Sequence, residues 1–238
     1  MKRKPDQAHV WTDEELSKLE SRIAAEYKKA AEELQEKVDA YFEQFKKRDE
    51  EQKALIGSVV NGREYTAEDY KQWRLAQIGR GKRFEALRDR LAERYTRANE
   101  VVAAYINGDM PKVYALNRAY GIDSAIKDSG GMLNGADFIM WDEQTVKRLL
   151  VEQPDLMPYY PQKRAVKRGI DLAYGKRKIT EFTTSAILQG KSVNGIARDL
   201  MDSLEKMERV SAVRAARTAI TAAYNGGRYD ADTELVEK

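Results

Sequence analysis

Residues that could do chemistry are few in this 238-residue chain. It has one histidine, His9, and no cysteine, so His–His metal pairs and Cys–His nucleophiles cannot form from these side chains. His9 lies in a polar leader before the first expected helix, where a solvated side chain is the simpler interpretation. Carboxylate pairs such as Glu32-Glu33 join neighbours that point about 100° apart on a helix. We therefore predict no enzyme activity, no catalytic residue, no metal site and no cofactor.

A short glycine motif, Gly190-Lys191-Ser192, resembles the end of a phosphate-binding loop. That loop needs a glycine five positions earlier, where Ser185 stands, and it needs a preceding strand. The residues upstream recur instead at helical spacing. The motif therefore predicts a helix that stops at Gly190 and another that is capped by Ser192.

The composition favours long helices with solvated faces. Charged residues make up 34% of the chain, against a usual value of about 25%, and there are only five prolines. We expect an elongated shape from this excess of charge. No apolar run approaches the roughly 20 residues of a membrane span, and no apolar stretch follows the basic start as in a signal peptide. The absence of cysteine fits a reducing cytoplasm.

The first predicted helix begins at a capping box formed by Thr12 and Glu15. Apolar residues behind it recur at steps of three, four or seven, over roughly 35–40 residues. They are Leu16, Leu19, Ile23, Tyr27, Leu34, Val38, Tyr41, Phe42 and Phe45. Such a long amphipathic helix needs a partner along its length, either an antiparallel helix of this chain or a coiled coil with another chain.

The obvious partner is a second long helix. Gly57 and Asn61-Gly62 interrupt the first pattern, Thr66 caps a short helix, and Gly79-Arg80-Gly81 marks a kink or a join. An apolar stripe then runs to Ile106, and Asn107-Gly108 is expected to end that helix. Its members are Phe84, Leu87, Leu91, Tyr95, Ala98, Val102, Tyr105 and Ile106.

The rest of the chain predicts shorter elements. A helix is expected over residues 110–127, followed by an irregular stretch that includes residues 138–141, a helix capped by Asp142, and a connector with three prolines. Three C-terminal helices follow. The first stops at Gly190, the second is capped by Ser192, and the third is capped by Ser211 and stops or bends near residues 225–227.

Together these patterns predict an all-α fold. Long antiparallel helices form an arm over residues 1–107, and short helices with an irregular connector occupy residues 108–160. A smaller basic helical bundle is expected over residues 161–238.

Charge is concentrated in that last part. Residues 161–228 hold 14 basic and six acidic residues, a net charge of +8, whereas the whole chain carries +3. Such a region can meet DNA phosphates or an acidic protein surface. The candidate contact residues are Lys176, Arg177, Lys178, Arg209, Arg214, Arg217 and Arg228.

Two stretches of this region resemble a known family. Residues 179–200, with a helix, Gly190, Ser192 and a second helix, are similar to the phage minor head proteins, the Mu F-like head morphogenesis family. Residues 212–228, which read Ala-Val-Arg-Ala-Ala-Arg-Thr-Ala-Ile-Thr-Ala-Ala-Tyr-Asn-Gly-Gly-Arg, are similar to it as well. The Trp141-Asp142-Glu143 helix and the proline connector also resemble the middle of that family, so the resemblance covers roughly residues 138–232.

The resemblance implies a minor capsid protein of a tailed bacteriophage. It implies a virion component inside the head at the portal vertex, made in the host cytoplasm, that acts in head assembly and in packaging or ejection of DNA. The implied partner is the portal protein, and the major capsid protein and packaged double-stranded DNA are further candidates. We expect no contact with a membrane, and self-association stays open. Relatives usually continue into a module with an Asp/Arg/His motif, which this sequence does not contain, so no activity of that module is carried over.

Two other functions stay open on sequence grounds. One is a helical scaffold or adaptor that does not touch DNA. The other is a nucleic-acid-processing enzyme, which would need a cluster of carboxylates that the linear sequence does not reveal.

Overall fold

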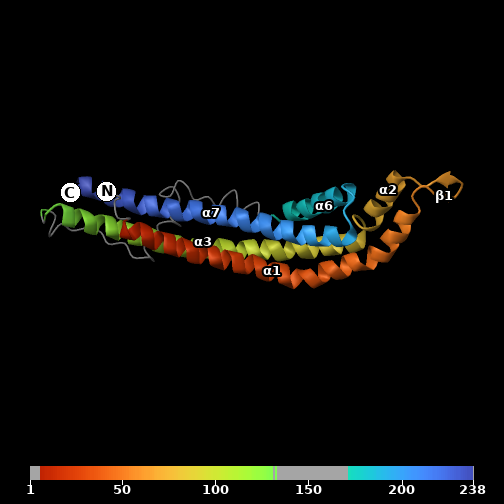
Figure 1. Ribbon diagram of the computed structural model, residues 1–238. Helices are drawn as coiled ribbons and strands as arrows, with labels where there is room; N and C mark the ends of the chain where they lie inside the picture. Colours follow the sequence, from red (N-terminus) through yellow and green to blue (C-terminus); the bar gives the residue numbers. More distant parts are fainter. Residues whose placement is uncertain (1–5, 131, 133–170, 238) are drawn as a thin grey trace. The chain divides into compact units, whose positions relative to one another are not determined.

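The computed structural model describes residues 6–130, 132 and 171–237, and their fold is all-α, as predicted (Figure 1). The helices are α1 (Gln7–Ala54), α2 (Ala67–Gln77), α3 (Lys82–Asp128), α6 (Leu172–Leu188) and α7 (Val193–Glu237). Within the described ranges, the strands are β1 (Val59–Val60) and β2 (Arg63–Glu64), which pair as an antiparallel hairpin between α1 and α2.

The chain divides into two compact units, and each unit is built from separate stretches of sequence. Unit 1 contains Met1–Ala24, Val101–Lys167 and Ser211–Lys238, and unit 2 contains Ala25–Glu100 and Arg168–Val210. The helices α1, α3 and α7 each contribute to both units. Helix α3 continues through residue 107, where one expected boundary lay, and the other expected boundary, at residue 161, lies outside the described residues.

In unit 1, α1 runs antiparallel to α3. Arg22 on α1 forms an ion pair with Asp109 on α3 at 2.9 Å. About two turns further along α3, the buried Asn117 donates its amide to the Thr12 hydroxyl of α1 at 3.0 Å. The helix α7 runs parallel to α3 and approaches it closely at Gly227. A Cβ atom placed there would lie 3.0 Å from the backbone nitrogen of Arg118 and nearer still to the Tyr114 carbonyl oxygen.

In unit 2, the apolar stripes predicted for α1 and α3 form the core. Leu34, Val38 and Phe42 of α1 are buried, as are Phe84 and Leu91 of α3. The C-terminal helices add to this core through side chains that are at most 5% exposed: Ile179, Ile187, Val193, Ile196, Leu200 and Leu204. The helix α6 also packs against α2 and, at Gly175, against α3.

The predicted start of the first helix is wrong. Helix α1 begins at Gln7, where Asp6 accepts the backbone N–H of Ala8 at 3.0 Å, so the expected capping box lies inside the helix. Thr12 is buried and donates its hydroxyl to the Ala8 carbonyl at 2.7 Å. His9 consequently lies on α1 and not in a polar leader; it is exposed and its ring meets Tyr224 edge-on at 5.7 Å.

Two predicted helix ends and the helix start predicted at Ser211 are also wrong. Helix α3 continues through Asn107-Gly108 and through Pro111, and α7 continues through Ser211 and residues 225–227. A single glycine inside a helix costs only about 1 kcal/mol relative to alanine, so packing along a long helix outweighs it.

Other local predictions are confirmed. Thr66 and Asp69 form a capping box at the start of α2, and Gly79-Arg80-Gly81 joins α2 to α3. Gly190 has a positive φ of 74° after α6, and the Ser192 hydroxyl accepts the backbone N–H of Gly195 at the start of α7. The segments predicted around residues 138–161 lie outside the described residues.

Candidate interaction surface

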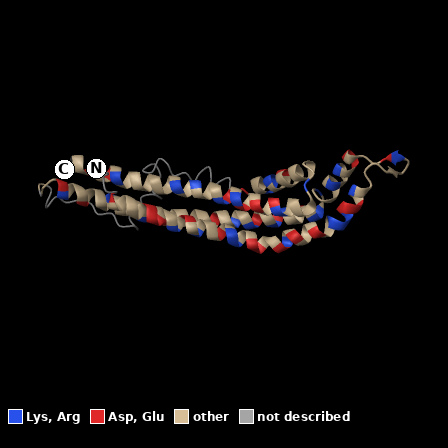
Figure 2. Ribbon diagram, in the orientation of Figure 1, with Lys and Arg blue, Asp and Glu red and all other residues tan. Residues whose placement is uncertain are grey.

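The seven basic candidates lie on the two C-terminal helices. Lys176, Arg177 and Lys178 are on α6, and Arg209, Arg214, Arg217 and Arg228 are on α7. The α6 residues and Arg209 belong to unit 2, and the others belong to unit 1. Basic and acidic side chains are interspersed along the described helices, so the charge of these candidates must be judged with their neighbours (Figure 2).

In unit 2, all of the basic candidates have carboxylate partners. Lys176 pairs with Asp89 of α3 at 3.1 Å, and Lys178 pairs with Glu181 at 2.9 Å. The longer contact of Arg177 with Glu181 measures 3.9 Å, and Arg209 pairs with Glu205 at 2.9 Å. Surface pairs of this kind contribute about 0–1 kcal/mol each, so they break readily, but they reduce the net positive field that a phosphate would meet.

In unit 1, the candidates differ from one another. Arg217 donates to Glu20 of α1 at 2.6 Å, and Arg228 pairs with Asp6 while its guanidinium lies 4.6 Å from the centre of the Tyr120 ring. Arg228 therefore joins α7 to α3 and to Asp6, the residue before α1. Arg214 is exposed and forms no ion pair with any residue that the structure describes. Of the candidates in this unit, Arg214 is the best placed to meet a partner.

A polar layer crosses the three long helices of unit 2, and the sequence patterns did not indicate it. The Tyr27 hydroxyl donates to Asn99 Oδ1, and Asn99 Nδ2 donates to Glu208 Oε2 at 3.2 Å. Burial raises the pKa of the Glu208 carboxyl, against the opposing effect of the hydrogen bond from Asn99. The spacing of these three residues matches that of the apolar core residues of their helices. Only the packing of the helices therefore shows that the three side chains contact one another.

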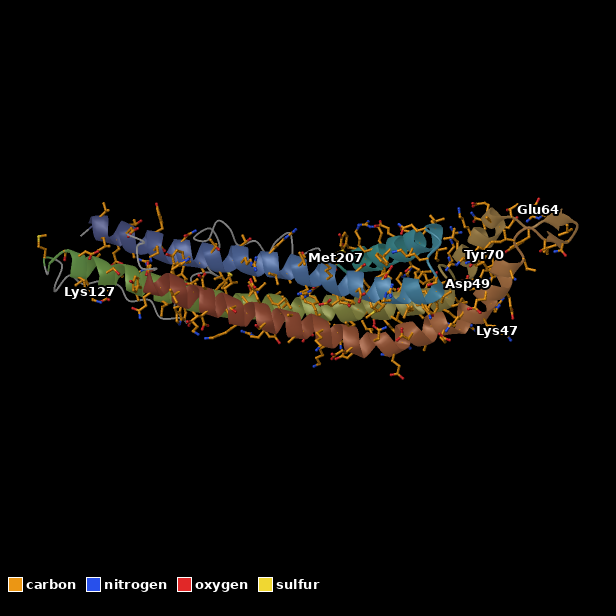
Figure 3. The ribbon with its side chains drawn as sticks, in the orientation of Figure 1. Lys47, Asp49, Glu64, Tyr70, Lys127 and Met207 are labelled. Atoms are coloured by element: carbon orange, nitrogen blue, oxygen red, sulfur yellow. The ribbon has the colours of Figure 1, made fainter. Side chains whose placement is uncertain are left out.

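A buried arginine fixes the turn between α6 and α7. Arg74 of α2 is 1% exposed; its Nε lies 2.9 Å from Asp49 of α1, and a second nitrogen donates to the Lys191 carbonyl at 2.6 Å. The Tyr70 hydroxyl donates to the same Asp49 carboxylate at 3.0 Å, and Figure 3 shows Asp49 and Tyr70 beside each other. This cluster holds the Gly190-Lys191-Ser192 turn in place, and the helix α6 precedes that turn where a phosphate-binding loop would follow a strand.

An acidic groove lies on the surface of unit 2. It has a volume of about 880 Å³ and lies between residues 32–43 of α1 and residues 194–198 of α7. One row of carboxylates borders it: Glu32, Glu36, Asp39 and Glu43. Adjacent acidic pairs diverge on a helix, but spacings of four and seven place these four carboxylates on one face. That spacing was the sequence signal for the groove.

Within the described residues, no three His, Cys, Asp or Glu side chains gather where they could hold a metal ion. None of the described helices combines the length and the apolar character needed to cross a membrane.

Comparison with protein-family models, with curated proteins and with solved structures finds no match to this chain.

Proposed function

We propose that this chain is a structural minor head protein of a tailed phage, bound to the portal protein inside the head. In this role it acts in head assembly and in packaging or ejection of DNA, without catalysis. The observation that carries the proposal is the sequence of residues 179–228, which resembles the minor head family. These residues form the part of α6 from residue 179 onward, the Gly190–Ser192 turn and most of α7.

The helical architecture supports a role in binding. Some charged side chains join helices within the described units, as in the Arg74–Asp49 and Arg217–Glu20 pairs. Side chains on α7 such as Met207 and Val210 are 40% and 38% exposed and offer apolar contact area (Figure 3). A partner that binds along α6 and α7 would meet both apolar and basic groups.

A helical adaptor that does not touch DNA is the second candidate. It is favoured by one observation: six of the seven basic candidates already have carboxylate partners within the chain. DNA phosphates attract proteins through unneutralised positive charge. Protein docking on α6 and α7 therefore demands less rearrangement than contact with the DNA backbone.

The direct test is co-purification with the cognate portal protein after co-expression, together with a mass-spectrometric inventory of intact virions. The expected result is a stable complex and the presence of the chain in particles. Removing residues 161–238 is a poor variant because α7 contributes to both units, so its loss would unfold the chain. The proposal fails if the folded full-length chain neither binds the portal protein nor occurs in purified particles.

Contact with DNA is tested at two exposed basic residues of α7 that form no ion pair with a described residue, Lys206 and Arg214. If the chain touches DNA, the K206E/R214E variant should bind duplex DNA more weakly and with a shallower dependence on salt than the original chain. No binding at low salt by either protein would favour the adaptor, whereas equal binding by both would place the DNA contact away from Lys206 and Arg214.

A further inference from the structure

One dipeptide recurs in this chain with a chemical reactivity that folding can suppress. The sequence contains five Asn-Gly pairs, which begin at Asn61, Asn107, Asn134, Asn194 and Asn225. An asparagine followed by glycine is prone to deamidation, because glycine has no side chain to hinder attack of its backbone nitrogen on the asparagine side chain. The third pair lies outside the described residues. The structure places the other four pairs in one turn and two helices.

Three of these pairs lie in helices, where the backbone opposes the reaction. Asn107 is in α3, and Asn194 and Asn225 are in α7. The N–H of Gly195 donates to the Ser192 hydroxyl at 3.1 Å, and the glycine N–H of the other two pairs donates to the carbonyl four residues earlier, as in any α-helix. Ring closure requires the backbone to leave the helical conformation. Each of these pairs can therefore react only after its helix opens locally.

The pair Asn61-Gly62 is in a different environment. It forms the two-residue turn between β1 and β2, with a φ of 51° at Asn61 and of 80° at Gly62, and both residues are exposed. The Gly62 N–H donates to no group that the structure describes. The strands have only two residues each, and Figure 1 shows their hairpin standing away from the helices α1 and α2 that it joins. A hairpin this short opens at little cost, so its turn can rotate into the conformation that ring closure needs.

We propose that Asn61 is the first of the four described Asn-Gly asparagines to be deamidated in the folded chain. The Gly62 nitrogen gives up its proton to the solvent and bonds to Cγ of Asn61. The bond from Cγ to the side-chain nitrogen then breaks, and that nitrogen takes up a proton and leaves as ammonia. Water opens the resulting succinimide ring. Opening at Cγ gives aspartate, and opening at the backbone carbonyl carbon of residue 61 gives isoaspartate, in which the chain runs through Cβ and Cγ.

Both products change the hairpin. Each adds a carboxylate two residues from Arg63, which pairs with Asp69 at 2.8 Å. Asp69 also belongs to the capping box of α2, where its carboxylate accepts the Thr66 N–H at 2.9 Å. Isoaspartate moreover adds one carbon atom to the backbone, so the two-residue turn that sets the register of β1 and β2 no longer fits. The modification therefore acts on the junction between α1 and α2, and it is independent of the proposed binding to a portal protein.

Peptide mapping of the folded full-length chain tests the proposal, because trypsin releases the four described pairs on different peptides. These are residues 54–63, 98–112, 192–198 and 218–228. After incubation in mildly alkaline buffer, tandem mass spectrometry measures the deamidated fraction of each Asn-Gly pair, and chromatography separates isoaspartate from aspartate. The pair in residues 54–63 should convert at least about tenfold faster than any of the other three, because a local opening free energy of only about 1.4 kcal/mol already slows a reaction by that factor.

Two controls separate the effect of the fold from that of the sequence. In concentrated guanidinium chloride the helices are lost, so all four pairs should convert at similar rates and the advantage of residues 54–63 should disappear. The variant N61D keeps a residue type that tolerates a positive φ and supplies the chromatographic standard for the aspartate product. Its peptide 54–63 should show no conversion. Circular dichroism checks that both proteins are folded before incubation.

The proposal is overturned if the Asn-Gly pair of any of the other three peptides converts as fast as that of residues 54–63 in the folded chain. It is likewise overturned if residues 54–63 stay unmodified in the folded chain while the unfolded chain is deamidated there. Faster conversion of residues 54–63 in the folded chain, together with similar conversion of all four pairs in denaturant, supports it.

Discussion

The closest contact between α3 and α7 in unit 1 gives a sharp prediction about two glycines. Gly108 and Gly227 both lie inside long helices of the same unit. A Cβ at Gly108 would have nothing within 4 Å, whereas a Cβ at Gly227 would press on backbone atoms of Tyr114 and Arg118. The same substitution to alanine should therefore change the stability of unit 1 in opposite directions.

The magnitudes follow from helix propensity and packing. Alanine is favoured over glycine in a helix interior by about 1 kcal/mol, so G108A should stabilise unit 1 by roughly that amount. At Gly227 the added methyl would lie 3.0 Å from the Arg118 nitrogen, against the roughly 3.5–4.0 Å of a relaxed contact, and the backbone cannot yield as a side-chain end can.

The helices α3 and α7 must then move apart. Overpacking of this kind costs about 1–3 kcal/mol, and separation also stretches the Tyr114–Asp230 and Arg118–Glu234 contacts. Burial of Arg118, which lowers its pKa, makes an ill-fitting partner costly. The stretched contacts offset the gain in propensity, so we expect G227A to destabilise unit 1 by about 1–3 kcal/mol.

Thermal unfolding followed by far-ultraviolet circular dichroism measures both changes. In a chain of this size 1 kcal/mol corresponds to about 2–4 °C, so the Tm of G108A should rise by about 2–4 °C and that of G227A should fall by about 2–12 °C. A G227A protein as stable as G108A would refute the close approach of α7 to the α3 backbone.

Three further predictions concern unit 2. Folding raises the pKa of Glu208, so the stability contributed by its protonated form is complete below the unfolded pKa of about 4.3 and is lost as pH rises through the folded pKa. The E208Q substitution removes this loss, so it should raise the Tm at neutral pH and leave it unchanged near pH 4. A pH series of melting curves measures both. R74A leaves Asp49 without its cation and should cost about 3–5 kcal/mol in urea unfolding, and recovery of less than half of that loss by R74A/D49N would argue against the ion pair as its source. T66A removes the α2 capping box and should cost about 1 kcal/mol by the same assay, whereas an unchanged midpoint would show that the cap contributes nothing.

The helix boundaries were predicted from rules that involve only neighbouring residues. This explains which of the predicted boundaries are right and which are wrong. The capping box at Thr66, the positive φ at Gly190 and the Ser192 cap are short-range features that the residues determine by themselves. Glycine was misleading in the long helices. At Gly227 the missing side chain serves close packing against α3, and no rule based on neighbours in sequence distinguishes that use from a helix end.

The sequence by itself determined that this chain is helical, because apolar residues at a period of 3.6 leave each long segment one face to bury. Only the tertiary structure decided which charges are neutralised: Arg217 finds Glu20 almost two hundred residues away, while Arg90 and Arg97 find no described carboxylate. The physical reason is range. Helix formation depends on residues three or four positions apart, but the pairing of charges depends on which helices pack together and in which register.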